Sequence, residues 1–183
     1  MEFTYTAPVI KTQENRKQEF EKAFLVSSND EILKIKILPF DFSNPPVDPI
    51  EFAHFLVRTM LERGGIGLAA NQIGYPYRVF AMAGEPNFVC YNPIIIGHGE
   101  QEEKAKEGCL SHHNFFVKVK RWKSIKTRFT MPNGEATTKV FAGLTARVFQ
   151  HELDHLDGES IKTKSSFLDR EKAYKEKMKL DKK

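Results

Sequence analysis

Residues 144–158, LTARVFQHELDHLDG, form the stretch that decides the fold. Leu144, Val148, His151 and His155 recur on one stripe at helical spacing, so the segment is predicted to be a helix. Histidines four residues apart project from the same face of a helix, and both imidazoles can then reach one metal ion. We therefore expect a central metal-binding helix, with the rest of the chain built around it.

Glu152 directly follows the first histidine and is the candidate general base. A carboxylate at this position can lie beside a water whose pKa a zinc-like ion lowers. The same pattern can arise by chance on a charged helix, but three fixed positions make coincidence rare. The motif predicts a catalytic metal site without choosing among the metallohydrolases.

The helix does not fix the third metal ligand. Gly158 agrees with the metzincin pattern, but Ile161 stands where that pattern requires a histidine. A thermolysin-like carboxylate further along the chain would be Glu171 or Glu176. Both belong to a charged tail, where a solvated helix face is the simpler interpretation, so an upstream ligand is favoured.

Cys109, in the segment EGCLS of residues 107–111, is the upstream candidate. A thiolate and two imidazoles would leave an open coordination position for water, and Gly108 lets backbone come close to another group. Taken alone, a single cysteine is more often a buried apolar side chain, and that alternative stays open here. Cys90 lies in an apolar run and fits the buried role better.

A second helix is predicted to begin after Asp48 and to end at Gly64 and Gly65. Asp48 can cap the helix, Pro49 suits its first turn, and Glu51 stands three residues after the cap. Its apolar face is expected to comprise Ile50, Ala53, Leu56, Val57, Met60 and Leu61.

Short apolar runs between the two helices predict strands. They lie at residues 78–84, 87–96 and 115–122, and in a hairpin over 124–142 with its turn at Pro132-Asn133-Gly134. Residues 32–38 are predicted as a strand or an extended lead-in. We expect one α+β domain, with antiparallel strands around the metal-binding helix and a C-terminal helix from Phe167.

Composition places the chain among soluble, intracellular proteins. Its 183 residues suit one domain, and a net charge of +4 is too mild to argue for nucleic-acid binding by itself. No apolar run approaches the roughly 20 residues of a membrane-spanning helix, and no secretory signal is visible at the start. With only two cysteines, a reducing compartment, the cytoplasm, is expected.

Residues 65–72, GIGLAANQ, form a third segment of interest. The small residues suit close backbone approach to a ligand or to another element, and Gln72 could offer its amide to a developing oxyanion. The glycines do not match a phosphate-binding loop, because no Lys-Ser/Thr follows. Read alone, the segment is equally well explained as a packing turn.

The segments GIGLAANQ, EGCLS and QHELDHLDG, in this order and spacing, resemble the three motifs of the peptide deformylases. The resemblance extends from about Pro46 to Gly158. It implies a catalytic domain over 31–166, preceded by an extension of unknown role over 1–30 and followed by a charged helix or tail over 167–183.

The resemblance implies an enzyme that removes the formyl group from the N-terminal formyl-methionine of nascent chains. Cys109, His151 and His155 would hold one divalent metal, natively Fe(II), often replaced by zinc, nickel or cobalt. Glu152 would take a proton from the attacking water and pass it to the leaving amine. The oxyanion would be stabilised by Gln72 and by the backbone N–H of Leu110.

The resemblance also implies how the substrate would bind. The peptide backbone would pair beside Ile66–Gly67 and Gly108–Leu110, and an apolar pocket formed by Ile66, Leu144 and Val148 would take the methionine side chain. Glu107 would orient its neighbours rather than bind the metal. A monomer is expected, and the C-terminal tail, with seven basic against four acidic residues from Asp169 onward, resembles a ribosome-docking helix of some bacterial members.

The chain departs from the family at His112-His113, where an apolar residue and a proline are usual. The simpler interpretation is a pair of solvent-facing loop histidines, and extra ligands or proton carriers are the alternative. The non-enzymatic alternative is a protein that binds nucleic acid through residues 117–129, VKVKRWKSIKTRF, and through the tail. The basic and aromatic residues of 117–129 alternate, which is also the pattern of an ordinary half-exposed strand. The cytoplasm expected for the enzyme would be that of a host if the chain is viral.

Overall fold

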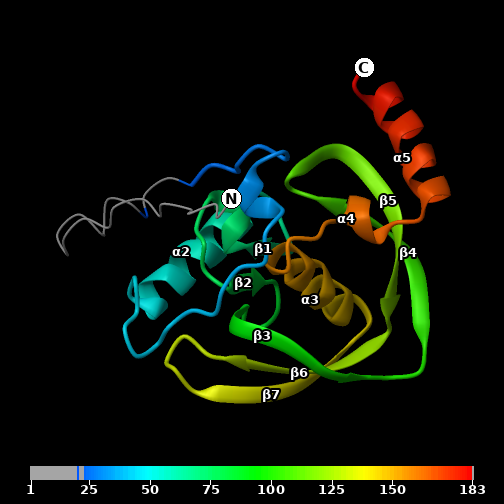
Figure 1. Cartoon of the computed structure of the whole chain (residues 1–183). Coiled ribbons are helices and arrows are strands. Elements are labelled where there is room, and N and C mark those ends of the chain that lie inside the picture. The colour runs from blue at the N-terminus through cyan, green and yellow to red at the C-terminus, as the bar shows by residue number, and fades with distance from the viewer. Residues whose placement is uncertain (1–19, 21–22, 183) are drawn as a thin grey trace, which may run out of the picture.

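The computed structural model describes residues 20 and 23–182, so most of the predicted extension over 1–30 lies outside the described residues. Figure 1 shows the elements, which are, in chain order, η2 (Glu31–Leu33), α2 (Pro49–Glu62), β1 (Gly67–Ala69), η3 (Ala70–Ile73), β2 (Val79–Met82), β3 (Phe88–His98), β4 (Glu102–Cys109), β5 (His112–Trp122), β6 (Ser124–Thr130), β7 (Ala136–Ala142), α3 (Gly143–Leu156), α4 (Ile161–Lys164) and α5 (Phe167–Leu180).

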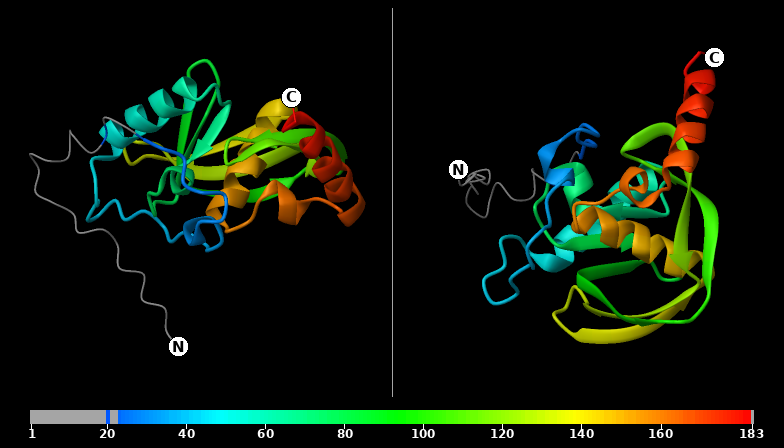
Figure 2. Two further views of the ribbon diagram at one scale, coloured as in Figure 1. Left: turned by 90° about the horizontal axis from the view of Figure 1, so that it is seen from above. Right: turned by 45° about the vertical axis from the view of Figure 1, so that its right-hand side comes forward.

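Two antiparallel sheets enclose helix α3. Five strands form one sheet in the order β1-β2-β3-β6-β7, and β4 and β5 form a separate long hairpin. Figures 1 and 2 show α3 lying between the sheet and the hairpin, and α3 packs against strands of both. The predicted α+β domain, with antiparallel strands around a central helix and a C-terminal helix, is confirmed.

Helix α3 is anchored by aromatic packing on the face opposite the histidines. It begins directly after β7, and the wholly buried Phe149 packs edge-on against Phe80, with ring centroids 5.0 Å apart. Phe129 and Phe141 complete this cluster around Phe149. Burial of several large side chains at one point fixes the rotation of the helix and therefore the direction of His151.

Helix α2 forms as its caps predict, but its buried face differs from the predicted one. The Asp48 carboxylate accepts hydrogen bonds from the first turn, and the helix ends at Glu62. Ile50 and Leu61, predicted as apolar-face residues, are about half exposed. Phe52 and Phe55 are buried instead, against a cluster of tyrosine rings, because aromatic packing outweighs the aliphatic stripe.

Residues 32–38, predicted as a strand or an extended lead-in, do not form a strand. Asp30 caps a single 3₁₀ turn at Glu31–Leu33, and the chain then continues without regular structure. Ile32, Leu33 and Ile37 are all buried in the core beside α3. A segment that covers the core as a loop can bury apolar residues without strand pairing, so alternation alone misled the prediction.

The hairpin over 124–142 is confirmed as β6 and β7. Gly134 takes φ of 88° in the turn, a left-handed conformation that glycine adopts without strain. Sequence patterns missed β4, because its exposed residues are almost all charged, and β1, because it is only three residues long.

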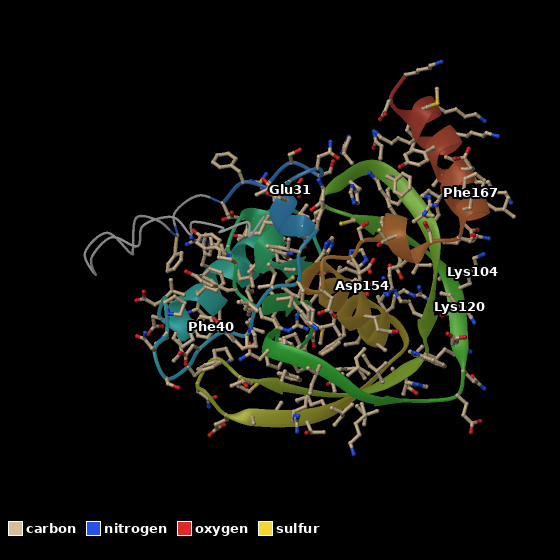
Figure 3. The ribbon with its side chains drawn as sticks, in the orientation of Figure 1. Glu31, Phe40, Lys104, Lys120, Asp154 and Phe167 are labelled. Atoms are coloured by element: carbon tan, nitrogen blue, oxygen red, sulfur yellow. The ribbon has the colours of Figure 1, made fainter. Side chains whose placement is uncertain are left out.

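Helix α5 packs along the β4–β5 hairpin. Ala173 is buried there and Tyr174 packs on Phe115, with ring centroids 5.0 Å apart. Acidic residues of α5 contact the hairpin: Lys104 pairs with Asp169 at 2.6 Å, near the start of the helix at the right of Figure 3. Within the described part of the chain, none of the helices has the length and apolar character needed to span a membrane.

Candidate metal centre

A thiol and two imidazoles meet beside α3. The side-chain donor atoms of Cys109, His151 and His155 all lie within 4.8 Å of one another. Cys109 Sγ is 3.2 Å from Nε2 of His155, and the two imidazole rings are 5.1 Å apart between centroids. The end of β4 supplies the thiol and α3 supplies both imidazoles, so residues far apart in sequence share one site.

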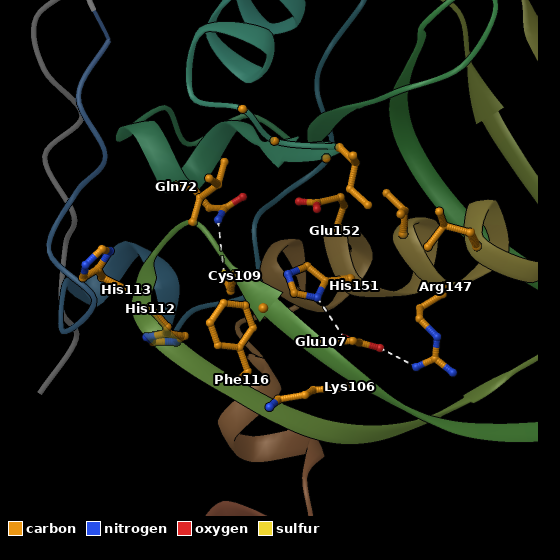
Figure 4. Close-up of a pocket in the computed structure, with 18 of the residues that line it drawn as sticks. Gln72, Lys106, Glu107, Cys109, His112, His113, Phe116, Arg147, His151 and Glu152 are labelled. Atoms are coloured by element: carbon orange, nitrogen blue, oxygen red, sulfur yellow. Dashed lines mark hydrogen bonds and ion pairs between the residues drawn. The ribbon is translucent and has the colours of Figure 1, made fainter. Parts of the chain in front are cut away.

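Glu107 fixes the orientation of the His151 ring through a contact at Nδ1. Its Oε2 lies 3.0 Å from Nδ1 of His151, while Arg121 and Arg147 donate to the same carboxylate at 3.0 and 2.7 Å. Burial opposes ionisation of Glu107, but the hydrogen bonds from His151 and Arg121 outweigh it and lower its pKa to about 2. An ionised carboxylate fixes the proton on Nδ1 and leaves Nε2 free to bind a metal (Figure 4).

The donor set fits a divalent metal ion. Burial lowers the pKa of His155 well below its ordinary value, so this imidazole is neutral, as a ligand must be. Burial also opposes protonation of His151, yet its contacts with Cys109 and Glu107 raise its pKa to about 10. Its neighbours therefore favour positive charge at this ring, and a metal ion would replace the proton on Nε2. A thiolate with two imidazoles suits zinc-like and other transition metals.

Glu152 lies in a tight, buried position beside this cluster. Burial raises its pKa to about 7, and its Oε2 has no hydrogen-bond partner within the described residues. Gly67 of β1 leaves the space that the carboxylate fills, since any Cβ at that position would overlap it. A buried carboxyl group with a pKa near neutrality suits proton transfer.

Gln72 is fixed at both ends of its amide. Its Oε1 accepts a hydrogen bond from the backbone N–H of Ala69 at 2.9 Å, and its Nε2 donates to Oγ of Ser111 at 3.0 Å. The same Nε2 is 3.6 Å from Sγ of Cys109. Leu110 lies in the turn between Cys109 and Ser111, so its backbone is close to this amide. The arrangement presents polar hydrogens toward the cluster.

A cleft of about 610 Å³ opens onto these groups (Figure 4). All five residues predicted to bind substrate line it, namely Ile66, Gly67, Gly108, Leu144 and Val148. Val148 is buried, whereas Ile66 and Leu144 are more than half exposed and form the mouth. The cleft runs between the outer edge of β1 and β4, so two strand edges flank it.

The interpretation of His112 and His113 as solvent-facing loop residues is wrong for His112. Strand β5 begins at His112, which pairs with Cys109 across a tight turn, and the ring is 8% exposed. Burial, followed by repulsion from Lys162 and His151, lowers its pKa to about 4. His113 is exposed, as predicted. The pairing with Cys109 turns alternate side chains inward, which a loop interpretation overlooked.

The alternative metal ligands lie elsewhere. Glu171 and Glu176 are exposed on α5, and Glu176 pairs with Lys106 at 2.8 Å. Among the described residues, only Cys109, His151 and His155 form a group of three side chains that could hold a metal ion. Cys90 is wholly buried, as predicted, and burial raises the pKa of its thiol.

The basic strand of the nucleic-acid hypothesis is an ordinary half-exposed strand. Val117 and Val119 point inward while Lys118 and Lys120 point outward. Arg121 of this strand is buried and pairs with Glu107 and Asp154. Sequence reasoning missed the roles of Arg121 and Arg147, because their partners lie too far along the chain to leave a local pattern.

Comparison with known proteins gives one family. The model of the family described as Polypeptide deformylase matches residues 22–171. A peptide deformylase of Aquifex aeolicus is 40% identical over 131 residues, which is 68% of this chain and 73% of that protein. One from Thermotoga petrophila is 43% identical over 104 residues, and there the match spans only 63% of the relative's length.

Solved structures agree with the sequence matches. The peptide deformylase of Thermotoga maritima superposes with a TM-score of 0.72 at 34% identity, covering 79% of this chain and 97% of that one. The Synechococcus elongatus enzyme, solved in complex with actinonin, gives a TM-score of 0.78 at 27% identity, covering 85% of this chain and 88% of that one.

Proposed function

Since the chain belongs to the polypeptide deformylase family, we propose that it removes the formyl group from the N-terminal formyl-methionine of nascent peptides. One observation carries this proposal: the donor atoms of Cys109, His151 and His155 lie within 4.8 Å of one another, and beside them on α3 is Glu152, whose Oε2 has no hydrogen-bond partner among the described residues. That combination suits hydrolysis of a small amide by a polarised water.

We propose that Cys109, His151 and His155 hold one divalent metal. When bound, the metal supplies a Lewis acid that lowers the pKa of water and polarises the formyl carbonyl. Glu107 keeps Nε2 of His151 directed at the site through the hydrogen bond at Nδ1. Iron(II) is the proposed native metal, with zinc, nickel or cobalt as substitutes, because each accepts this thiolate and imidazole set.

Glu152 acts as general base and then as general acid. Its carboxylate takes a proton from the attacking water and later delivers it to the amine of the departing peptide. Burial raises its pKa to about 7, so it can both accept and release a proton near neutral pH. Gly67 supports this role, because the absence of a side chain there keeps the carboxylate in its place.

The oxyanion that develops on the formyl oxygen needs hydrogen-bond donors. We assign this role to Nε2 of Gln72 and the backbone N–H of Leu110. The bond from Ala69 to Oε1 of Gln72 fixes which end of the amide faces the thiol of Cys109. A donor held in advance stabilises charge without having to reorganise during the reaction.

The peptide binds between two strand edges. β1 is the last strand of its sheet and pairs only with β2, and β4 pairs only with β5 among the described strands. Backbone at Gly67 and Gly108 can therefore hydrogen-bond to an extended peptide, as in strand addition. Ile66, Leu144 and Val148 form the apolar pocket for the methionine side chain.

Helix α5 is proposed to approach the ribosome. Its acidic Asp169 and Glu176 pair with Lys104 and Lys106 of the hairpin, which leaves the helix surface richer in lysine. Lysines that face solvent attract the phosphates of ribosomal RNA, with affinity that falls as salt rises. Replacing Lys172, Lys175 and Lys179 by glutamine should reduce co-sedimentation with ribosomes at low salt. Lys36, Lys123 and Lys126 lie outside α5. An equal loss of co-sedimentation when these three are replaced by glutamine would contradict a docking role for the helix.

We propose that residues 31–166 form the catalytic domain, that 167–183 form a docking helix attached to it, and that the enzyme acts as a cytoplasmic monomer. We assign no role to the 1–30 segment; among the contacts of its described part is a hydrogen bond from Val26 N–H to the carbonyl of Gln72 at 2.9 Å.

The direct test of the proposed function compares two substrates. Formate release from formyl-Met-Ala-Ser should be rapid with metal-loaded protein and absent after chelation. Acetate release from acetyl-Met-Ala-Ser should be far slower, because the acetyl methyl group must fit where the formyl hydrogen sits. Peptide-bond cleavage of either substrate, with no release of formate, would support a peptidase instead.

A further inference from the structure

A second, smaller pocket lies behind the metal site. Its volume is about 250 Å³, and it is enclosed by the start of β5, α4, α5 and the segment at Ser28. The same His112 that lines the catalytic cleft also lines this pocket. The proposed deformylation does not use this space, so the groups around it need a separate explanation.

Lys162 gives the pocket an uncompensated positive charge. It forms no ion pair with any described carboxylate, and its Nζ lies 5.6 Å from the ring centroid of Phe115. Burial, followed by repulsion from Lys177, lowers the pKa of Lys162, and only the Cys109 thiol acts in the opposite direction. A cation placed in a partly buried position, near a second cation and without a counter-ion, is stabilised by any anion that enters.

Lys177 is the second cation on the pocket wall. It pairs with Asp181 at 2.6 Å, and Asn114 donates to the other oxygen of that carboxylate at 3.0 Å. Asp181 is therefore a single carboxylate beside two lysines, and a net positive charge remains at the pocket. The ion pair with Asp181 is about one third exposed on the lysine side, so it is easily exchanged for another acceptor.

His112 and two hydroxyl residues supply neutral donors. The His112 ring makes no hydrogen bond with the described residues, although the side chain is more than nine-tenths buried. A histidine ring carries at least one N–H, which His112 can donate to a group bound in the pocket. Ser28 and Ser111 line the same space and can each donate an O–H.

We propose that this pocket binds a small tetrahedral oxyanion, inorganic phosphate or the phosphate of a monoester, between Lys162 and Lys177. Two ammonium groups match the double negative charge of phosphate, and donors on several sides suit its four oxygens better than a planar carboxylate. The apolar rings of Phe115 and Tyr174 close the floor and limit the size of the occupant.

Titration calorimetry at constant ionic strength tests the site on the nickel-loaded full-length protein. Inorganic phosphate, glycerol 3-phosphate and formate are the three probes. We expect phosphate to bind, and Lys162→Met and Lys177→Met to weaken it by at least about tenfold each, since a charge-assisted hydrogen bond is lost. Tighter binding of glycerol 3-phosphate than of phosphate would identify a monoester as the ligand.

Matched variants separate this pocket from other phosphate sites. Lys175 lies exposed on α5, the helix that carries Lys177. Lys175→Gln removes an equal charge and should leave phosphate binding unchanged. Lys162→Arg keeps the charge and should retain binding, which also guards against a Lys162→Met protein that folds poorly. Phosphate affinity that is equal in wild type and Lys162→Met would reveal binding at the metal and overturn the proposal. Formate binding tighter than phosphate would overturn it as well.

Discussion

Nδ1 of His151 lies 3.0 Å from Oε2 of Glu107, and this single contact links the metal centre to a buried charge network. Glu107 in turn accepts hydrogen bonds from Arg121 and Arg147. The direction of a proposed metal ligand is therefore set by residues on the hairpin and on α3 together.

Glu107→Gln should reduce metal affinity by about 10–100-fold, because the amide no longer holds the proton on Nδ1 of His151 as strongly. Competition with a fluorescent chelator measures the affinity. Glu103→Gln is the matched control, since that carboxylate is 56% exposed and 3.6 Å from Arg147. An equal loss of affinity in both variants would mean that charge near the site, and not the contact with His151, controls binding.

Gly67→Ala should abolish most of the activity while leaving the fold intact. The new Cβ would occupy the position of the Glu152 carboxylate, and the backbone there needs no left-handed conformation. Gly97→Ala in β3 meets only ordinary contact, with the nearest atom 3.8 Å away, and should keep full activity. Formate release and thermal unfolding, measured on both proteins, check the prediction. Full activity in Gly67→Ala would show that Glu152 is free to move.

The iron form should lose activity in air faster than the nickel or cobalt form. Oxygen oxidises iron(II) more readily than nickel(II) or cobalt(II), and oxidation at the metal exposes the thiolate ligand to oxidation as well. Activity is followed with time in aerobic buffer after anaerobic reconstitution with each metal. Equal lifetimes for the three forms would contradict a thiolate-bound iron centre.

Arg121→Met should destabilise the protein by about 3–5 kcal/mol, since it removes the buried cation that Glu107 and the partly buried Asp154 share. Arg121 is 4% exposed and contacts both Glu107 and Asp154. Urea unfolding of the metal-free protein gives the free energy. Lys123→Met, on the exposed edge of the same hairpin region, should change it little, and a comparable loss there would assign the effect to surface charge instead.

Local signals account for much of the fold. Asp48 and Pro49 correctly predict the start of α2, and Gly134 correctly predicts the turn of the β6–β7 hairpin. The residues of the candidate site could be selected from three short segments because metal-binding chemistry leaves a dense pattern of histidine, cysteine and glutamate. The structure brings those residues together at one cleft, which they line apart from the buried His155.

Other features depend on partners that are distant in sequence. The charged strand β4 carries no hydrophobic pattern, and its place is set by pairing with β5. His112 is buried because it stands opposite Cys109 across a tight turn, which composition does not reveal. The sequence suggests an exposed cation at Arg121, but the side chain is buried, because it forms ion pairs with Glu107 and Asp154.

Formate release by wild type and Glu152→Gln tests the central claim most directly. Both proteins are loaded anaerobically with the same metal, and the metal content is measured before formyl-Met-Ala-Ser is added. We predict an equal metal content and a fall in rate of about 10²–10⁴-fold in the variant, as expected for loss of a general base. An unchanged rate in Glu152→Gln, with the metal retained, would contradict the account.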